Sequence, residues 1–586
     1  MPTTIKTKIV ATLGPASDDK ETIRRLVGAG MDVARLNFSH GSHEEHKQKI
    51  DRVKEIEAEC GKPIGIMLDT QGPEIRTGEL KEEVILREGE NLVLSPGKFK
   101  GTADRIPINY DIISDFVKPG CSILLDDGLI ELRVEDVLEK DIACSVVNGG
   151  RLAQKKSINL PGVRIDLPGV TEKDEQDIKF GIKNGIHFIA ASFVRRAENV
   201  IEIRQLLEEE WAEGIKIIAK IENQEAVENI DEIIDVSDGI MIARGDLGVE
   251  TPPEKVPVIQ KMIIEKCNEA ALPVITATQM LNSMIENPRP TRAESSDVAN
   301  AIYDGTDATM LSGETAVGKY PVKAVETMDH IAREVEKSPS YRKVIRERGS
   351  DKSDTVTEAI SYASHRTATD LDAEAIITAT GSGYTARMVS RYRALLPVIA
   401  VTPNEMVQHT LTLLWGVSPL LVCQSTSTDE MVDSAVTAAL ESGLVKDGDL
   451  VTVTAGVPVG IPGTTNMIRV EVVGKPIIEG QGVGKDIVSG NVVFARTADE
   501  AIEKVVEDVI LVTRMTNEQY LPAMKKAAAV ITAEGGITSH SAVAGLKLGI
   551  PVVVNSGQVF ELLEEGELVT IDGVRGLVYR GKANIK

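Results

Sequence analysis

The chain has 586 residues, of which 42% are hydrophobic and 26% are charged, and its formal net charge at pH 7 is −24. At roughly 100–200 residues per domain this length predicts about three to five domains, and the composition is that of an ordinary globular protein with room for several cores. The acidic balance argues against a general nucleic-acid binder, which needs a basic face. It does not exclude small anionic substrates, because a cleft can be locally positive.

The five cysteines are scattered, and none belongs to a C-x-x-C pair. Zinc and redox sites are therefore weakly supported, and the sparse, odd count favours a reducing cytoplasm. No stretch approaches the ~18 consecutive apolar residues of a membrane span, and the first residues have no signal-peptide layout. We expect a cytoplasmic protein with no membrane segment.

The first ~340 residues repeat one pattern, a short apolar run followed by an amphipathic helical stretch. This alternation predicts parallel strands with right-handed helical crossovers, and eight repeats predict a (β/α)8 TIM barrel. We assign the barrel to residues 1–72 and 168–344. The eight apolar runs are 9–13, 33–38, 64–68, 188–193, 217–221, 240–243, 274–276 and 308–311.

Between the third and fourth runs the texture changes to short β-type segments separated by Gly, Pro and Asp. We expect an all-β domain at 73–167, inserted after the third barrel strand. An insertion at this point leaves from the C-terminal face of the barrel, where barrel active sites lie. The inserted domain is therefore expected to be a lid.

Residues 345–473 again alternate apolar runs with helical stretches, and we assign them to a separate α/β domain. The Gly-rich segment 474–485 is expected to be a linker. It opens an additional small C-terminal α/β domain, 474–586.

Polar side chains follow six of the eight predicted barrel strands, at the ends that meet at one mouth. Glu222 and Asp246 are hard oxygen ligands suited to Mg2+. Arg35 and Arg76 can hold phosphate oxygens, and Lys220 adds a point charge for a transferring phosphoryl group. The hydroxyls of Thr278 and Ser312 can order water for proton transfer. Any one of these residues alone would more often be a solvated or ion-paired group, but six polar strand ends on one side favour a catalytic mouth.

The segments at these strand ends resemble the motifs of the pyruvate kinase family, in the family's order. The resemblance covers about residues 1–473. The matching motifs are ARLNFSHG (34–41), LDTQGPEIRTG (68–78), IIAKIENQEAV (217–227), ARGDLGVE (243–250), ATQMLNSMI (277–285) and LSGETAVGKYP (311–321).

The resemblance implies transfer of a phosphoryl group from phosphoenolpyruvate to ADP, giving pyruvate and ATP in glycolysis. It implies that Lys220 stabilises the transferring group, that Glu222 and Asp246 bind Mg2+, and that Thr278 holds the pyruvate carboxylate or relays a proton. Ser312 and Glu314 would join the water network that protonates enolpyruvate. The other implied roles are a K+ site at Asn37, Ser39, Asp69 and the Thr70 carbonyl; phosphoenolpyruvate contacts at Arg35, Lys220, Ala243, Arg244, Gly245, Asp246 and Thr278; and nucleotide contacts at Asn37, His40, Arg76 and Lys155.

Two positions bear on variation within the family. Glu74 matches the members that require K+, whereas others carry lysine there. Gln71 stands where some members have a lysine, which leaves a nucleotide contact there in doubt. The spacing from Gly313 to Lys319 imitates a P-loop, but Tyr320 replaces the Ser or Thr that would bind Mg2+.

A second ligand site is predicted in the 345–473 domain, where hydroxyl groups gather at the start of a helix. Free N–H groups and the helix dipole attract anions at such a place. We favour the phosphate of an allosteric effector, AMP or ribose 5-phosphate, over a set of helix caps or a dinucleotide fingerprint at 381–386. The residues are Thr378, Thr380, Ser382 and Thr385.

The last domain contains GGITSHSA at 535–542, which resembles the phosphohistidine domain of phosphoenolpyruvate-using enzymes such as pyruvate phosphate dikinase. His540 would be the phosphorylated residue at a helix start, a favourable place for an anion. Leu546 stands where that family has arginine, and the chain has no ATP-grasp partner domain. A structural or regulatory role is therefore preferred over phosphorylation.

Three functions are weighed together. The first is an allosteric pyruvate kinase dependent on Mg2+ and K+, which the resemblance implies to be a homotetramer acting only on small molecules. The second is a dikinase-like enzyme that phosphorylates His540. The third is an inactive effector-binding scaffold, which would require loss of the groups at the barrel mouth.

Overall fold

The computed structural model describes residues 5–165, 167–347, 355–458 and 464–583. It divides into two compact units, which we describe separately. The first comprises residues 1–349 and 405–419, and the second comprises residues 350–404 and 420–586. No helix in these described ranges is both long and apolar enough to cross a membrane.

The first unit contains the predicted barrel. Within the described residues, eight parallel strands close in the order β1-β16-β15-β14-β13-β12-β3-β2, which confirms the (β/α)8 fold class. Neighbouring strands pair in register, so that Asn37 lies beside Asp69 and Lys220 beside Met241. The strands are β1 (Lys8–Thr12), β2 (Val33–Asn37), β3 (Gly65–Asp69), β12 (Phe188–Ala191), β13 (Lys216–Ile221), β14 (Gly239–Ala243), β15 (Val274–Ala277) and β16 (Ala308–Leu311).

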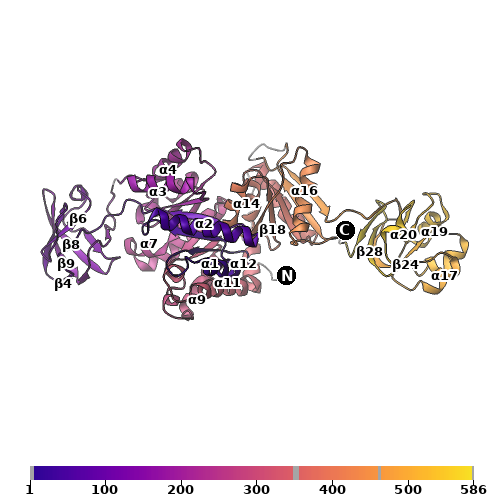
Figure 1. The fold of residues 1–586 in the computed structure, drawn as a ribbon, viewed down its shortest axis with the longest axis horizontal. Helices are drawn as coiled ribbons and strands as arrows, with labels where there is room; N and C mark the ends of the chain where they lie inside the picture. Colours follow the sequence, from indigo (N-terminus) through magenta and orange to yellow (C-terminus); the bar gives the residue numbers. More distant parts are fainter. Residues whose placement is uncertain (1–4, 166, 348–354, 459–463, 584–586) are drawn as a thin grey trace. The chain divides into compact units, whose positions relative to one another are not determined.

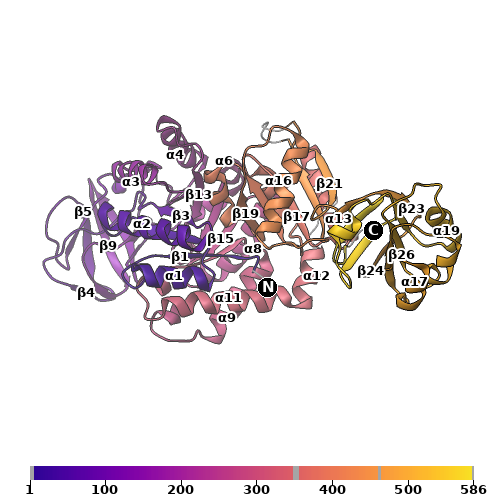
Figure 2. The same ribbon diagram turned by 45° about the vertical axis from the view of Figure 1, so that its right-hand side comes forward.

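Helices surround the barrel, and α1, α2 and α11 pack side by side on its outside (Figures 1 and 2). Several start at polar caps that the sequence provides; Ser42 and Glu45 form a reciprocal capping box at the start of α2, which satisfies two otherwise free backbone N–H groups. The helices are α1 (Lys20–Ala29), α2 (His43–Cys60), α3 (Glu172–Lys183), α4 (Ala197–Glu209), α5 (Gln224–Glu228), α6 (Ile230–Val236), α7 (Arg244–Glu250), α8 (Val256–Glu269), α9 (Arg292–Asp304), α10 (Gly313–Ala316), α11 (Pro321–Lys337) and α12 (Pro339–Glu347).

The segment Glu405–Pro419 belongs to the same unit as the barrel, although it comes from the middle of the predicted 345–473 domain. It carries α15 (Glu405–Thr410) and a short 3-10 turn, Leu411–Leu413. Leu413 is buried in the hydrophobic cluster of the barrel interior, with Val10, Met67 and Phe188. The barrel interior is thus filled in part by a residue that lies more than two hundred positions from the nearest of these three.

The inserted lid is all-β, as predicted. In its described part, six strands form a sheet in the order β11-β7-β8-β9-β5-β6, and two more pair as β10-β4. A separate core of aliphatic side chains holds these strands together. The strands are β4 (Val84–Leu86), β5 (Asn91–Pro96), β6 (Arg105–Ile108), β7 (Ser122–Leu125), β8 (Ile130–Leu138), β9 (Asp141–Asn148), β10 (Gly150–Leu152) and β11 (Ile158–Asn159).

The second unit begins with the α/β domain. Strands β18, β17 and β20 are parallel neighbours, and β21 is antiparallel to β20. Helices α13 and α16 both pack against β17. The elements are α13 (Val356–Asp370), β17 (Ala375–Ala379), α14 (Tyr384–Ser390), β18 (Val398–Thr402), β19 (Val417–Leu421), which contains the boundary between the units, α16 (Thr428–Glu441), β20 (Leu450–Ala455) and β21 (Met467–Val472).

The C-terminal domain is built on one mixed sheet of the order β22-β29-β28-β24-β25-β26-β27-β23 within the described residues. The expectation of a linker at 474–485 is wrong, because β22 and β23 lie in it and pair with β29 and β27. The elements are β22 (Ile478–Glu479), β23 (Gln481–Val483), β24 (Ile487–Phe494), α17 (Ala498–Lys504), β25 (Val509–Thr513), α18 (Leu521–Met524), β26 (Ala529–Thr532), α19 (His540–Leu548), β27 (Val552–Val554), α20 (Val559–Leu562), β28 (Leu568–Asp572) and β29 (Leu577–Arg580).

Candidate active site

The ends of β2, β3 and β13 bring four predicted site residues into one buried network. Lys220 Nζ lies 3.1 Å from Asp69 Oδ1 and 2.9 Å from Glu222 Oε1. Arg35 Nε lies 2.6 Å from Asp69 Oδ2. All four residues are buried. Their charges therefore interact in a medium far less polarisable than water.

The network shifts the pKa values of two of its members, Lys220 and Asp69. Burial alone would lower the pKa of Lys220, but the carboxylates of Asp69 and Glu222 raise it above its ordinary value. Burial alone would raise the pKa of Asp69, but Arg35 and Lys220 lower it. The ammonium of Lys220 and the carboxylate of Asp69 therefore stabilise each other's charged forms at the mouth, where a transferring phosphoryl group needs positive charge.

Ser192 is a member of this network that the sequence analysis missed. It follows β12 directly, and its Oγ accepts a hydrogen bond from Lys220 Nζ at 2.7 Å. The same oxygen lies 2.7 Å from the Thr70 carbonyl and 3.2 Å from Asp69 Oδ1. The sequence analysis extended the fourth apolar run to residue 193, which placed Ser192 inside the strand, whereas the strand ends at Ala191.

Glu222 and Asp246, the residues predicted to bind Mg2+, follow the neighbouring strands β13 and β14. Burial and, to a smaller degree, the nearby Glu222 carboxylate raise the pKa of Asp246 to about 7, although Lys220 opposes the shift. Two carboxylates that disfavour each other's charge suit a dication, which would relieve the repulsion. The described residues contain no cluster of three or more His, Cys, Asp or Glu side chains able to hold a metal. Two carboxylates fit an ion such as Mg2+, which commonly uses one or two protein carboxylates together with substrate oxygens and water.

The residues predicted for K+ lie on the neighbouring strands β2 and β3. Asn37 pairs with Asp69 in register, and its Oδ1 accepts the Ser39 N–H at 3.1 Å. Asp69 and Thr70 are both buried. An amide, a hydroxyl, a carboxylate and a carbonyl are all hard oxygen donors, so the set fits a group 1 cation in chemistry.

Thr278 follows β15 in a left-handed backbone conformation with φ of +65°, which is unfavourable for a β-branched residue. Its Oγ1 accepts the Gly245 N–H at 2.8 Å and donates to the Ala277 carbonyl at 2.6 Å. Arg244 Nη2 donates to the Thr278 carbonyl at 2.9 Å and lies 2.7 Å from Asp297 Oδ2. The side chain of Arg244 thus holds Thr278 in its strained geometry. Ala243 pairs in register with Ala277, the residue before Thr278.

Ser312 follows β16, and its Oγ is buried with no hydrogen-bond partner within the described ranges. Its backbone N–H donates to Glu314 Oε2 at 2.8 Å, and the other Glu314 oxygen accepts the Leu281 N–H at 3.0 Å. A buried hydroxyl without a partner is costly and is commonly satisfied by water. This position suits the water network expected there.

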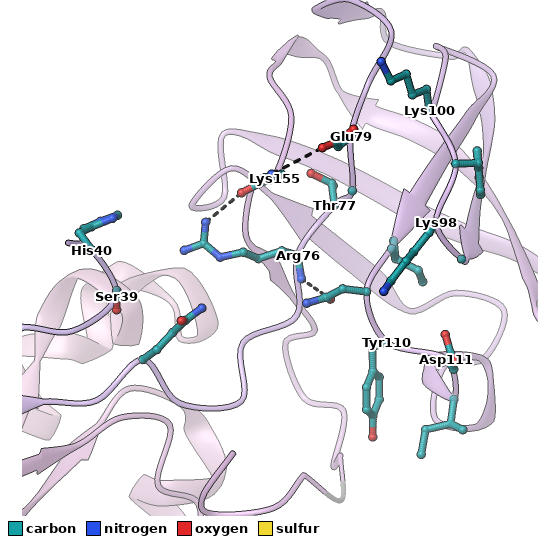
Figure 3. Close-up of a pocket in the computed structure, with 17 residues that line it drawn as sticks. Ser39, His40, Arg76, Thr77, Glu79, Lys98, Lys100, Tyr110, Asp111 and Lys155 are labelled. Atoms are coloured by element: carbon teal, nitrogen blue, oxygen red, sulfur yellow. Dashed lines mark hydrogen bonds and ion pairs between the residues drawn. The ribbon is translucent and has the colours of Figure 1, made fainter. Parts of the chain in front are cut away.

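A cavity of about 1200 Å3 lies between the lid and the barrel (Figure 3). It brings together Ser39, His40, Arg76 and Lys155. Arg76 reaches from the lid toward His40 in Figure 3, and its Nη1 donates to the Lys155 carbonyl at 2.9 Å. No direct contact joins Arg76 to the Lys220 network in the described structure, so the cavity and the network are two adjoining parts of the site.

Among the lid residues that line this cavity and were not predicted are Lys98, Lys100 and Tyr110. Gln71 also lines it, so the position that carries lysine in some family members does face the cavity. Lys98 and Lys100 are exposed and make no ion pair with any described residue. The available sequence signal was two lysines close together in the inserted domain of an acidic chain, but only the fold shows that they face the cavity.

The predicted effector loop precedes α14. Thr380 Oγ1 accepts the Gly383 N–H at 2.9 Å, and Thr385 Oγ1 lies 2.8 Å from Thr465 Oγ1. Thr378 is fully buried and its Oγ1 has no hydrogen-bond partner among the described residues, whereas Ser382 is exposed. The four hydroxyls therefore differ in accessibility, and those of Thr380 and Thr385 already have partners within the domain.

In the C-terminal domain His540 is the first residue of α19, and Ser539 caps the helix. His540 Nδ1 lies 2.9 Å from Thr516 Oγ1. The ring is half-buried, and this hydrogen bond orients its other nitrogen.

Three family models match the chain. The pyruvate kinase barrel domain matches residues 4–325, the pyruvate kinase alpha/beta domain matches residues 358–471, and the mobile domain of PEP-utilising enzymes matches residues 505–576. The three matches agree with the barrel, the α/β domain and the C-terminal domain of the fold.

Curated relatives match over almost the whole length. The pyruvate kinase of Geobacillus stearothermophilus is 54% identical over 99% of both chains. Those of Bacillus licheniformis and Sporosarcina psychrophila are 52% and 51% identical over 99% of this chain and 100% of theirs. The barrel mouth, the three matched domains and these full-length relatives together show that the chain belongs to the pyruvate kinase family.

Proposed function

We propose that this phosphotransferase, which converts phosphoenolpyruvate and ADP into pyruvate and ATP, carries out phosphoryl transfer at the Lys220 network. The enol P–O bond breaks and a new P–O bond forms to the terminal phosphate of ADP. The single observation that carries the proposal is the buried Lys220 ammonium, held by Asp69, Ser192 and Glu222. A fixed cation in a buried site stabilises charge in the transition state without reorganisation.

Arg35 adds a second buried cation, positioned by Asp69 and by Thr12 Oγ1 at 2.9 Å. Glu222 and Asp246 would hold Mg2+, and Asn37, Ser39, Asp69 and the Thr70 carbonyl would hold K+. When bound, these cations supply positive charge that orients phosphate oxygens and offsets their repulsion.

Thr278 and Ser312 are proposed to serve the proton step. The backbone N–H of Gly245 and the constrained Thr278 hydroxyl offer a site for the substrate carboxylate. The Ser312 hydroxyl can order a water that delivers a proton to enolpyruvate. Arg244, proposed from the sequence as a substrate contact, acts through the position of Thr278 and through the backbone of Ala243 to Asp246.

The lid cavity is proposed to bind the nucleotide, with His40, Arg76 and Lys155 on its polyphosphate and Asn37 at its edge. Basic side chains from both the barrel and the lid line this one cavity, which supports the assignment. Nucleotide binding would then bring the two parts of the site together, as lids do in phosphoryl transfer.

The test is Lys220→Ala, with Lys216→Ala as the matched control on the same strand. Lys216 lies at the other end of β13, where it pairs with Asp238. We expect Lys220→Ala to reduce pyruvate formation from phosphoenolpyruvate and ADP by at least about 10³-fold, with the fold retained and Lys216→Ala near normal. Turnover of Lys220→Ala within tenfold of the unmodified enzyme would contradict the role.

Further expectations extend this proposal. AMP or ribose 5-phosphate is proposed as the effector at Thr378, Thr380, Ser382 and Thr385. The boundaries 1–72 with 168–344, 73–167, 345–473 and 474–586 stay predictions, as does a homotetramer, which light scattering would test. The free thiols at all five cysteines support a cytoplasmic site of action.

A further inference from the structure

Helix α3 begins where the chain returns from the lid to the barrel, and its first turns carry two buried carboxylates. Asp174 is 2% exposed and Asp177 is 3% exposed. A carboxylate buried to this degree is costly unless it is hydrogen-bonded. Its partners therefore indicate what it is there to hold.

Asp174 accepts hydrogen bonds from both segments that connect the barrel to the lid, the outgoing crossing at 71–72 and the returning crossing at Thr171. Its Oδ1 accepts the N–H groups of Gln71 and Gly72 at 3.0 and 3.1 Å. Its Oδ2 accepts the Thr171 N–H at 3.2 Å and the Thr171 hydroxyl at 2.6 Å. Gln71 and Gly72 are the last residues before the predicted lid, and Thr171 follows its end, so one carboxylate joins the outgoing and the returning chain.

The outgoing crossing is also confined from the opposite side. Gly72 has φ of +72°, and a Cβ on it would stand 2.9 Å from atoms of Ser192 and Phe193. Ser192 Oγ in turn lies 2.7 Å from the Thr70 carbonyl. Residues 70–72 are therefore held between the carboxylate of α3 and the loop after β12, with the direction of the Thr70 carbonyl set by both.

The same helix holds the loop that follows β2. Lys173 Nζ donates to the Phe38 carbonyl at 2.6 Å and to Asp177 Oδ2 at 2.9 Å. His43 Nε2 lies 2.6 Å from Asp177 Oδ1, and the His43 ring stacks on Phe180 at 4.3 Å between centroids. Phe38 stands between Asn37 and Ser39, so α3 contacts both loops that carry the oxygen ligands and part of the nucleotide cavity.

We propose that Asp174 is a positioning residue that couples the lid hinge to the cation and nucleotide sites. The proposal rests on the roles proposed above for Thr70, Asn37 and Ser39. Loss of its carboxylate removes the hydrogen bonds that link residues 71–72 to Thr171, so the two connections between barrel and lid are no longer joined. The groups that perform the chemistry, Lys220 and Glu222, have their own partners and stay in place.

The experiment compares Asp174→Asn and Asp174→Ala with Glu175→Gln. Asparagine keeps an acceptor for the Gln71 and Gly72 N–H groups but presents an amide donor to Thr171. Glu175 is the next residue of the same turn and is exposed, paired with Lys179. We measure the K+ concentration for half-maximal activity, the KM for ADP, kcat and the melting temperature.

We expect Asp174→Asn to raise the half-saturating K+ and the KM for ADP at least fivefold, with kcat within threefold and Glu175→Gln unchanged. Asp174→Ala should raise the half-saturating K+ and the KM for ADP further, again with little change in kcat. Unchanged constants, or a fall in kcat alone, would overturn the proposal. If the unmodified enzyme needs no K+, the proposed K+ site fails, and the KM for ADP then decides the role of Asp174 by itself.

Discussion

The imidazole ring of His187 is stacked on that of His409, with 4.1 Å between the centroids and 6° between the planes. His409 Nδ1 and Nε2 both donate hydrogen bonds, to the Glu405 carbonyl at 2.7 Å and to Glu57 Oε1 at 2.5 Å, so this ring is the charged member. His187 Nδ1 instead accepts the Ile66 N–H at 3.0 Å and is the neutral member.

This pair predicts how stability depends on pH. Burial lowers the pKa of His187 well below 6.5, and the charge on His409 and on Lys54 lowers it further. Because His187 protonates near pH 6.5 only when unfolded, its contribution is present above that pH and is lost as the pH falls below it, by up to about 1.4 kcal/mol per pH unit. His187→Asn, which keeps an acceptor for Ile66, should lose less melting temperature between pH 7 and pH 5.5 than the unmodified enzyme.

His409 supplies the opposite control. Burial opposes its charge, but Glu57 and the Glu405 carbonyl raise its pKa above 6.5. Its contribution is therefore present below pH 6.5 and is lost as the pH rises through the folded pKa. His409→Gln should be destabilised most at acid pH. If the melting temperatures of His187→Asn and His409→Gln change with pH in the same way between pH 5.5 and pH 7, the histidine stack is not the pH-sensitive element.

The unpaired lid lysines predict an electrostatic effect on ADP capture. Lys98 and Lys100 line the nucleotide cavity, and charges of this kind raise the local concentration of an anionic ligand. Lys98→Ala with Lys100→Ala should raise the KM for ADP several-fold at low salt, leave kcat unchanged and weaken the salt dependence of that KM. Lys140→Ala in the turn between β8 and β9 is the control. If Lys140→Ala raised the KM for ADP to the same extent, the effect would reflect only the removal of positive charge from the lid and not its place on the cavity.

The effector loop predicts a charge-dependent loss of activation. Ser382 is exposed beside the start of α14, so Ser382→Asp would repel a bound phosphate, whereas Ser382→Asn is a neutral control of similar size. We expect AMP or ribose 5-phosphate to shift the phosphoenolpyruvate saturation curve to lower concentration in the unmodified and Asn proteins. The Asp variant should lose this shift with its basal curve unchanged. A full shift in Ser382→Asp would place the effector elsewhere.

The C-terminal domain predicts kinase activity independent of His540. His540→Ala should keep kcat and both KM values within twofold, because His540 lies in a separate matched domain and its recorded partner is Thr516. Incubation with phosphoenolpyruvate labelled on its phosphate tests the alternative directly. Acid-labile label on the unmodified protein that disappears in His540→Ala would instead support phosphotransfer through this domain.

Much of the barrel and its mouth could be predicted from local sequence. The alternation of apolar runs and amphipathic helices determines a parallel (β/α)8 barrel, and the carboxyl ends of parallel strands meet at one mouth whatever the details of packing. The sequence therefore predicts that Arg35, Asp69, Lys220 and Glu222 lie close together, and their contacts confirm it. The error at 474–485 has the opposite cause, because strands of two and three residues set among glycines carry almost no periodic signal.

Only the tertiary structure decided which residues far apart in the chain are in contact. Asp174 reaches Gln71 across 103 positions, and Ser192 reaches Thr70 across 122. Leu413 fills the barrel interior from the segment 405–419. A short polar or aliphatic residue has no local pattern that names its partner, since the partner is set by the packing of whole elements. The sequence thus determined which strands meet and which charges line their ends, and the packing of α3, the lid and segment 405–419 decided how those ends are held.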